Sequence, residues 1–115
     1  MTNSSFENKI GIIGLGVLGS AIAENFISKN IPIKGYDINK KVFKKLKSDK
    51  INFYDSIDKI SGDCNFIITS LPSESSLIKV CKSMINKNKL IIIETSTLPL
   101  DCKLEAKKIL LKKNI

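Results

Sequence analysis

The chain has 115 residues, the common size of a single domain with its own hydrophobic core. Hydrophobic residues make up 43% of it and charged residues 26%, which is typical of a folded globular chain and not of a disordered one. The formal net charge is +8, but the lysines are spread over residues 40–50, 79–89 and 103–113 without interleaved stacking aromatics. This distribution favours solvated helix faces over a nucleic-acid interface.

Histidine and cysteine usage narrow the possible chemistry. The chain has no histidine, which excludes histidine-based acid–base catalysis, Ser-His-Asp and Cys-His nucleophiles and histidine metal ligation from it. Its three cysteines are widely spaced and form no C-x-x-C pair, which favours a reducing cytoplasm over a disulfide framework or a zinc site. Cys81 and Cys102 fall in helical patterns and are interpreted as small buried side chains. No apolar run is long enough to span a membrane, so we expect a cytoplasmic protein with no membrane partner.

Short apolar runs alternate with amphipathic stretches along the chain, after a polar tail at residues 1–8. The runs predict strands at 9–13, 33–36, 52–54, 65–71 and 90–94. The stretches predict helices at 17–28, 40–48, 77–85 and 99–113, with a single helical turn near 56–60. Strands that alternate with helices indicate an α/β protein with a doubly wound parallel sheet, formed by one domain at 9–115.

A G-x-G-x-x-G pattern lies directly after the first predicted strand and directly opens the first predicted helix. Its residues are Gly14, Leu15, Gly16, Val17, Leu18 and Gly19. In this context Gly14 permits the tight turn, Gly16 lets the backbone approach a pyrophosphate, and Gly19 lets the helix pack close to the strand. Glycine used only for a compact turn does not predict three glycines at these positions. The pattern therefore predicts a Rossmann-type sheet that binds the small-molecule dinucleotide NAD(H) or NADP(H).

Asp37 is the candidate ribose-binding residue. It follows the second predicted strand, where a carboxylate accepts hydrogen bonds from the adenosine ribose hydroxyls. A carboxylate there repels a 2′-phosphate, so we expect NAD to be favoured, while nearby Lys40 and Lys41 soften this preference and leave NADP possible. The alternative explanation is that Asp37 caps the following helix.

Two later loops are rich in hydroxyl groups and follow the fourth and fifth predicted strands, at residues 71–76 and 95–99. Ligands of this fold bind at the carboxyl ends of the strands, so both loops are candidates for cofactor contacts. Helix capping explains one serine or threonine in each loop equally well.

The sequence resembles the 3-hydroxyisobutyrate dehydrogenase family, a β-hydroxyacid dehydrogenase group related to 6-phosphogluconate dehydrogenase. The motifs that carry the resemblance are residues 10–19, 35–37, 67–72 and 94–99, and the similarity runs from about residue 9 to the end. It implies that Leu71 and Pro72 line the cofactor and that Ser76 and Thr97 contact its nicotinamide half. It also implies hydride transfer between NAD(P) and a small 3-hydroxy acid. The family usually has Met at Leu18, an amide at Ser76 and often Asp at Glu94.

In that family, a sixth strand, a Ser-Gly-Gly substrate loop and an all-helical C-terminal domain with the catalytic lysine follow the region seen here. No lysine of this chain matches that lysine, so no catalytic residue is predicted. We therefore expect a cofactor-binding half that is inactive alone, with homo-oligomers formed only by a longer chain. A stand-alone dinucleotide-binding module and a binder of nucleic acid or acidic partners are the alternatives.

Overall fold

The computed structural model describes residues 8–115, so the predicted tail at 1–8 lies outside the described residues except for Asn8. The strands are β1 (Ile10–Ile13), β2 (Ile33–Tyr36), β3 (Ile51–Phe53), β4 (Phe66–Thr69) and β5 (Ile91–Glu94). The helices are α1 (Val17–Ser28), α2 (Ile57–Asp63), α3 (Glu74–Ser83) and α4 (Leu100–Leu111), with a 3-10 helix η2 (Lys40–Leu46) between β2 and β3.

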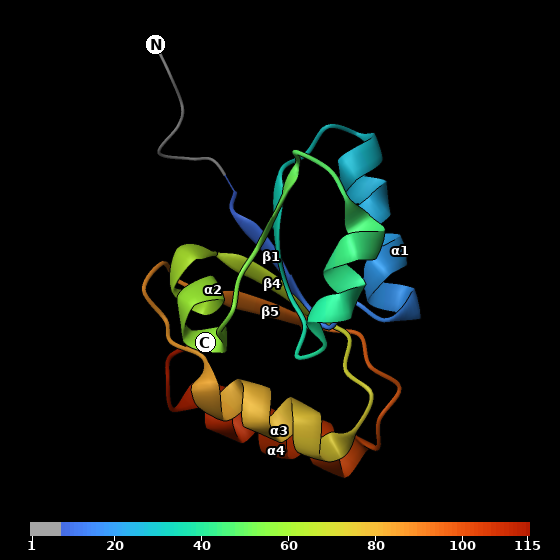
Figure 1. Cartoon of the computed structure of the whole chain (residues 1–115). Helices are drawn as coiled ribbons and strands as arrows, with labels where there is room; N and C mark the ends of the chain where they lie inside the picture. The colour runs from blue at the N-terminus through green and yellow to red at the C-terminus, as the bar shows by residue number, and fades with distance from the viewer. Residues whose placement is uncertain (1–7) are drawn as a thin grey trace.

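The five strands form one parallel sheet in the order β3-β2-β1-β4-β5. Strand order reverses between β1 and β4, the switch point at which such sheets bind ligands. The helices cover both faces: α1 lies on one side, and the α3–α4 pair lies on the other (Figure 1). The predicted α/β Rossmann-type architecture is confirmed.

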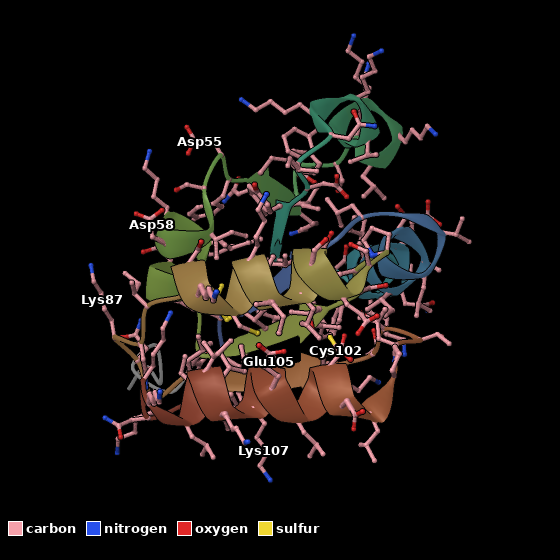
Figure 2. The ribbon with its side chains drawn as sticks, turned by 90° about the horizontal axis from the view of Figure 1, so that it is seen from below. Asp55, Asp58, Lys87, Cys102, Glu105 and Lys107 are labelled. Carbon is pink, nitrogen blue, oxygen red and sulfur yellow. The ribbon has the colours of Figure 1, made fainter. Side chains whose placement is uncertain are left out.

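Two apolar cores follow from the alternation of side chains along the central strand. Ile12 of β1 packs into a cluster with Leu15, Ala23 and residues of β2, β3 and η2. Its neighbour Ile13 packs on the opposite face, in the larger cluster formed with α2, α3 and α4. Figure 2 shows Cys102 on the side of α4 that faces α3, and Lys107 on the opposite side. Cys81 and Cys102 are both buried, as predicted.

Helix α1 meets the sheet through small residues. Gly19 and Ala23 are its buried positions, whereas Leu18 is 50% exposed. Ile22 and Phe26 are partly buried and pack against the same core. The helix lies so close to the β1–α1 turn that a Cβ on Gly19 would overlap the Gly14 carbonyl oxygen, so glycine is required at this position.

Several element boundaries also differ from the prediction. The segment predicted as a helix at 40–48 is the short 3-10 helix η2, in which Leu46 alone is buried. The single turn predicted near 56–60 is the seven-residue helix α2, capped by Ser56. Helix α3 begins earlier than predicted, because the Ser73 side chain accepts a hydrogen bond from the Ser76 backbone N–H and caps it.

Strand β5 forms one edge of the sheet, and no segment among residues 8–115 covers its α1-side face. Ile91 is 51% exposed and Ile93 is 48% exposed on that face. On β4, Phe66 and Ile68 lie beside them and are only partly buried. Within the described residues, no helix is both long and apolar enough to cross a membrane.

Candidate functional site

The glycine turn between β1 and α1 is built so that two glycines are required by packing and one is not. Gly14 has a φ of 96°, and a Cβ added to it would overlap the carbonyl oxygen of Ser70 at the end of β4. A Cβ on Gly19 would overlap the Gly14 carbonyl oxygen. A Cβ on Gly16 would have no atom within 4 Å. The space above Gly16 is therefore free for a ligand.

The amino end of α1 supplies hydrogen-bond donors to that space. Gly16 is the N-cap and offers no side-chain cap, and the first helical hydrogen bond runs from the Ser20 N–H to the Gly16 carbonyl at 2.9 Å. The preceding N–H groups have no partner within the helix, as at any helix start. The Val17 side chain is 95% exposed and leaves this end open. An anion placed here meets backbone donors and the positive end of the helix dipole.

Asp37, directly after β2, is tied to the glycine turn. One carboxylate oxygen accepts a 2.7 Å hydrogen bond from the Leu15 backbone N–H, and the other accepts one of 2.8 Å from the Asn39 N–H. The following helix η2 is capped by Asn39, whose side chain accepts from the Lys41 N–H. The alternative that Asp37 serves as the helix cap is therefore wrong, because that position belongs to Asn39.

A cavity of about 600 Å³ opens beside the turn at the carboxyl edge of the sheet. Seven of the residues predicted from the sequence line it: Gly14, Gly16, Val17, Asp37, Leu71, Pro72 and Ser76. The other four, Leu15, Leu18, Gly19 and Thr97, are not among its lining residues. Leu15 is buried in the core and Thr97 is exposed on the β5–α4 loop. The structure thus gathers most, but not all, of the predicted residues around one space.

The sequence interpretation missed one wall of this cavity. Ser76 was predicted, but Lys79, Val80 and Ser83 on the same face of α3 were not, and neither were Ile38 and Ile57, which also line the cavity. The spacing 76, 79, 80 and 83 is that of a single helix face, which could have revealed this wall once α3 was placed. Ile38, an apolar side chain that is 87% exposed, adds apolar surface to the cavity.

The hydroxyl groups of the two later loops have different roles. In the β4–α3 loop, the Ser73 side chain caps α3, and its hydroxyl lies 2.7 Å from that of Ser76. Capping therefore explains Ser73. In the β5–α4 loop, the N-cap of α4 is Pro99, without a side-chain hydrogen bond. Capping explains none of the hydroxyls in that loop, where Ser96 instead accepts a 2.7 Å hydrogen bond from the Leu71 N–H.

Glu94, the last residue of β5, organises this second loop. One of its carboxylate oxygens accepts from the Ser96 N–H at 2.8 Å and from the Thr69 hydroxyl at 3.3 Å. The other oxygen is buried and lies 3.1 Å from the Lys103 ammonium group. Burial by itself would raise the pKa of Glu94, but the hydrogen bonds from Ser96 and the charge of Lys103 outweigh it and hold this pKa below its usual value.

Comparison with known proteins decides the family. The sequence profile for the NAD-binding domain of 6-phosphogluconate dehydrogenase matches residues 9–115. The chain belongs to this family. This chain is 30% identical over 78 residues to a probable mitochondrial 3-hydroxyisobutyrate dehydrogenase of Arabidopsis thaliana, and the match covers 68% of this chain and 22% of that protein. It is 27% identical over 105 residues to the mitochondrial 3-hydroxyisobutyrate dehydrogenase of Drosophila melanogaster, covering 88% of this chain and 32% of that one.

Solved structures share the fold of this NAD-binding domain. A Mycobacterium tuberculosis 3-hydroxyisobutyrate dehydrogenase solved with L-serine matches with a TM-score of 0.86 and 15% identity, over 95% of this chain and 38% of that one. A reductive aminase from Aspergillus terreus, solved with NADPH4, cyclohexanone and allyl amine, matches with a TM-score of 0.83 and 13% identity, over 92% and 38%. The resemblance to the 3-hydroxyisobutyrate dehydrogenase family is confirmed, and these enzymes are oxidoreductases. The chain spans less than two fifths of each relative named here.

The residues of the NAD-binding domain fit an NAD(P) molecule. The missing Cβ of Gly16 leaves room for the pyrophosphate, and the open amino end of α1 provides its donors. Asp37 stands at the edge of the same cavity with its carboxylate fixed by backbone donors. When bound, a nicotinamide cofactor would supply the hydride acceptor or donor of a redox reaction.

Proposed function

We propose that this chain is the cofactor-binding part of a dehydrogenase of small 3-hydroxy acids and that it binds NAD(H) in preference to NADP(H). The observation that carries the cofactor preference is Asp37. Both of its oxygens accept hydrogen bonds from backbone N–H groups, which hold this acidic side chain in place at the edge of the cavity. A 2′-phosphate at that position would meet the charge of this carboxylate at short range.

The cationic residues near Asp37 support the same preference. The chain contains no arginine, the residue that most often receives a 2′-phosphate in this fold. Lys40 and Lys41 are exposed on η2 and make no ion pair with Asp37 in the described structure. They stay available to a 2′-phosphate as point charges, which keeps NADP(H) as the weaker ligand.

The predicted contact residues are assigned to the two halves of the dinucleotide by their strands. Gly14, Gly16 and Asp37 belong to the half of the sheet that receives adenosine and pyrophosphate. Leu71, Pro72 and Ser76 follow β4 and are proposed to meet the nicotinamide half. Thr97 follows β5 outside the cavity lining, so its contact requires the nicotinamide to extend past that cavity. Leu15, Leu18 and Gly19 are proposed to act through the backbone of the turn.

The substrate class rests on the resemblance to 3-hydroxyisobutyrate dehydrogenases over the matched residues. In such a reaction a hydride leaves the carbon that bears the substrate hydroxyl, and a separate group accepts the hydroxyl proton. No residue of this chain is proposed for that proton transfer. The chain by itself is therefore expected to bind NADH but not to oxidise 3-hydroxyisobutyrate, which NADH absorbance would follow; measurable turnover would show that it carries its own acid–base group.

The cofactor preference is tested by calorimetric titration of NADH and NADPH into the wild type, Asp37→Asn and Asp37→Ala. The wild type should bind NADH at least tenfold more tightly than NADPH, a difference of about 1.4 kcal/mol. Asp37→Asn removes the charge but keeps an oxygen that can accept from the Leu15 N–H, so it should gain affinity for NADPH and lose part of that for NADH. Asp37→Ala leaves that N–H without its partner and should weaken both ligands.

Asp49→Asn is the matched control, because Asp49 is an exposed carboxylate in the turn before β3. It therefore lies at the amino ends of the strands, away from the cavity at their carboxyl ends. It changes the net charge by the same amount and should leave the ratio of the two affinities unchanged. Equal affinities of wild type and Asp37→Asn for both cofactors would contradict the role given to Asp37. Failure of the wild type to bind either cofactor would contradict the proposed function.

A further inference from the structure

The β4–α3 and β5–α4 loops are joined by a buried side chain that the cofactor assignment leaves unused. Ser96 is 4% exposed, and its hydroxyl accepts a 2.7 Å hydrogen bond from the Leu71 backbone N–H. Leu71 and Pro72 line the cavity, and Thr97 is the next residue after Ser96. One hydrogen bond therefore links the residues of both loops that lie toward the nicotinamide half of the site.

The backbone of Ser96 is itself fixed by Glu94. Its backbone N–H donates to Glu94 at 2.8 Å, and the same carboxylate is fixed by the Thr69 hydroxyl and the Lys103 ammonium group. Residues of β4 and α4 thus converge on a carboxylate of β5, which in turn holds the Ser96 backbone in place. Linked hydrogen bonds and one ion pair around the buried Thr69 and Ser96 favour a single arrangement of these side chains.

An ordinary capping role does not account for this geometry. Helix α4 begins at Leu100 with Pro99 as its N-cap, and the Ser96 hydroxyl accepts from Leu71, in the other loop. Its bond spans 25 residues of sequence and fixes the distance between two loops at the carboxyl edge. In a doubly wound sheet these loops, after the strands beyond the switch point, border the second nucleotide of a dinucleotide.

We propose that Ser96 is a positioning residue for the nicotinamide half of the cofactor, with Glu94 as the group that orients it. The inference rests on the proposed function and goes beyond it, since it assigns a role to residues that do not line the cavity. Ser96 acts through Leu71 and Thr97: it sets the spacing of the two loops between which the nicotinamide ring lies. It does not contact the adenosine half, which is held by the glycine turn and Asp37.

The test compares two probes, NADH and ADP-ribose, the second of which lacks the nicotinamide ring. Ser96→Ala removes the acceptor for the Leu71 N–H and leaves the remaining contacts in place. Calorimetry should show NADH binding weakened about five- to tenfold, as expected from the loss of one positioned hydrogen bond, with ADP-ribose binding unchanged. Unchanged ADP-ribose binding also shows that the variant is folded.

Thr95→Val is the matched control. The Thr95 hydroxyl donates a 2.8 Å hydrogen bond to the Thr69 carbonyl at the same edge of the sheet, but it makes no bond to the Leu71 loop. Its removal should lower the melting temperature about as much as Ser96→Ala does and leave the ratio of NADH to ADP-ribose affinity at the wild-type value.

The possible outcomes separate the two proposals. Wild type that binds neither probe overturns the proposed function. Wild type that binds both probes equally tightly overturns the inference alone, because no nicotinamide contact then exists to be positioned. The inference is also wrong if Ser96→Ala leaves both affinities unchanged, reduces both equally or abolishes both, since each result makes Ser96 inert or merely structural.

Discussion

Gly16 and Gly19 provide the sharpest separation of ligand binding from folding in this chain. They are three residues apart in one turn, yet a Cβ on Gly16 meets nothing within 4 Å and a Cβ on Gly19 overlaps the Gly14 carbonyl. Gly16→Ala should therefore fold and lose cofactor binding, whereas Gly19→Ala should lose stability first.

The magnitudes follow from the local geometry. Gly16 has a φ of −72°, which alanine adopts without strain, and alanine is a poorer N-cap than glycine by about 0.5–1 kcal/mol. The melting temperature of the Gly16→Ala variant should fall by about 2–5 °C. At Gly19 alanine gains up to about 1 kcal/mol of helix propensity but must displace backbone, a change that costs about 1–3 kcal/mol or more. At the upper end of these ranges, which the overlap with a backbone carbonyl favours, the net loss is about 2 kcal/mol and should lower the melting temperature by about 5 °C or more.

Differential scanning calorimetry and NADH titration on the same samples provide the assay. Gly16→Ala should bind NADH at least tenfold more weakly than wild type, because its methyl group occupies the space assigned to the pyrophosphate. Wild-type NADH affinity in folded Gly16→Ala would refute the placement of the pyrophosphate. Wild-type stability in Gly19→Ala would refute the packing argument.

Three further predictions concern stability and reactivity. The Lys113 ammonium group donates to the carbonyls of Cys81, Lys82 and Met84 at the end of α3. Lys113→Met should therefore lower the free energy of unfolding by about 1–2 kcal/mol and the melting temperature by about 4–8 °C. An unchanged melting temperature would show that water replaces these hydrogen bonds. The pKa of Glu94 lies below its ordinary 4.5 in the folded state, so its stabilising contribution is present above that pH and is lost as the pH falls through the folded-state pKa. Denaturant titrations at pH 3–7 should therefore show a smaller acid loss of stability in Glu94→Gln than in wild type, and parallel curves would contradict this. Burial raises the pKa of the Cys64 and Cys81 thiols to about 11, so a thiol reagent at pH 8 should label them only after denaturant is added, and stoichiometric labelling of the native chain would argue against it.

The first βαβ unit was the most predictable part of the molecule. Strong signals of different kinds coincide there: a buried apolar run, the glycine pattern, an apolar helix and a second apolar run. The observed bounds of α1 and β2 accordingly equal the predicted ones, and β1 differs by one residue. The segment after β2 carries lysines and a single fully buried residue, Leu46, so its periodicity did not distinguish a 3-10 helix from an α-helix.

The candidate site was predictable only where local chemistry specified it. Gly14, Gly16 and Asp37 act through backbone geometry that the sequence spacing reveals. Ser96 could not be found this way, because its partner Leu71 lies in another loop and the pairing depends on β4 and β5 being adjacent. The buried position of Gly19 on α1 likewise depends on a contact with the Gly14 carbonyl and not on an apolar pattern.

The uncovered edge of β5 gives the net charge of the chain a protective role. Backbone groups of this strand that point away from β4 can template a strand from a second copy, and the half-exposed Ile91 and Ile93 make such pairing favourable. Nineteen lysines against eleven acidic residues make the copies repel one another. This repulsion reaches about 10 Å at 0.1 M salt and only about 3 Å at 1 M. Salt should accordingly trigger aggregation of this chain. At low ionic strength, repulsion between the lysine-rich surfaces should keep the copies apart in solution.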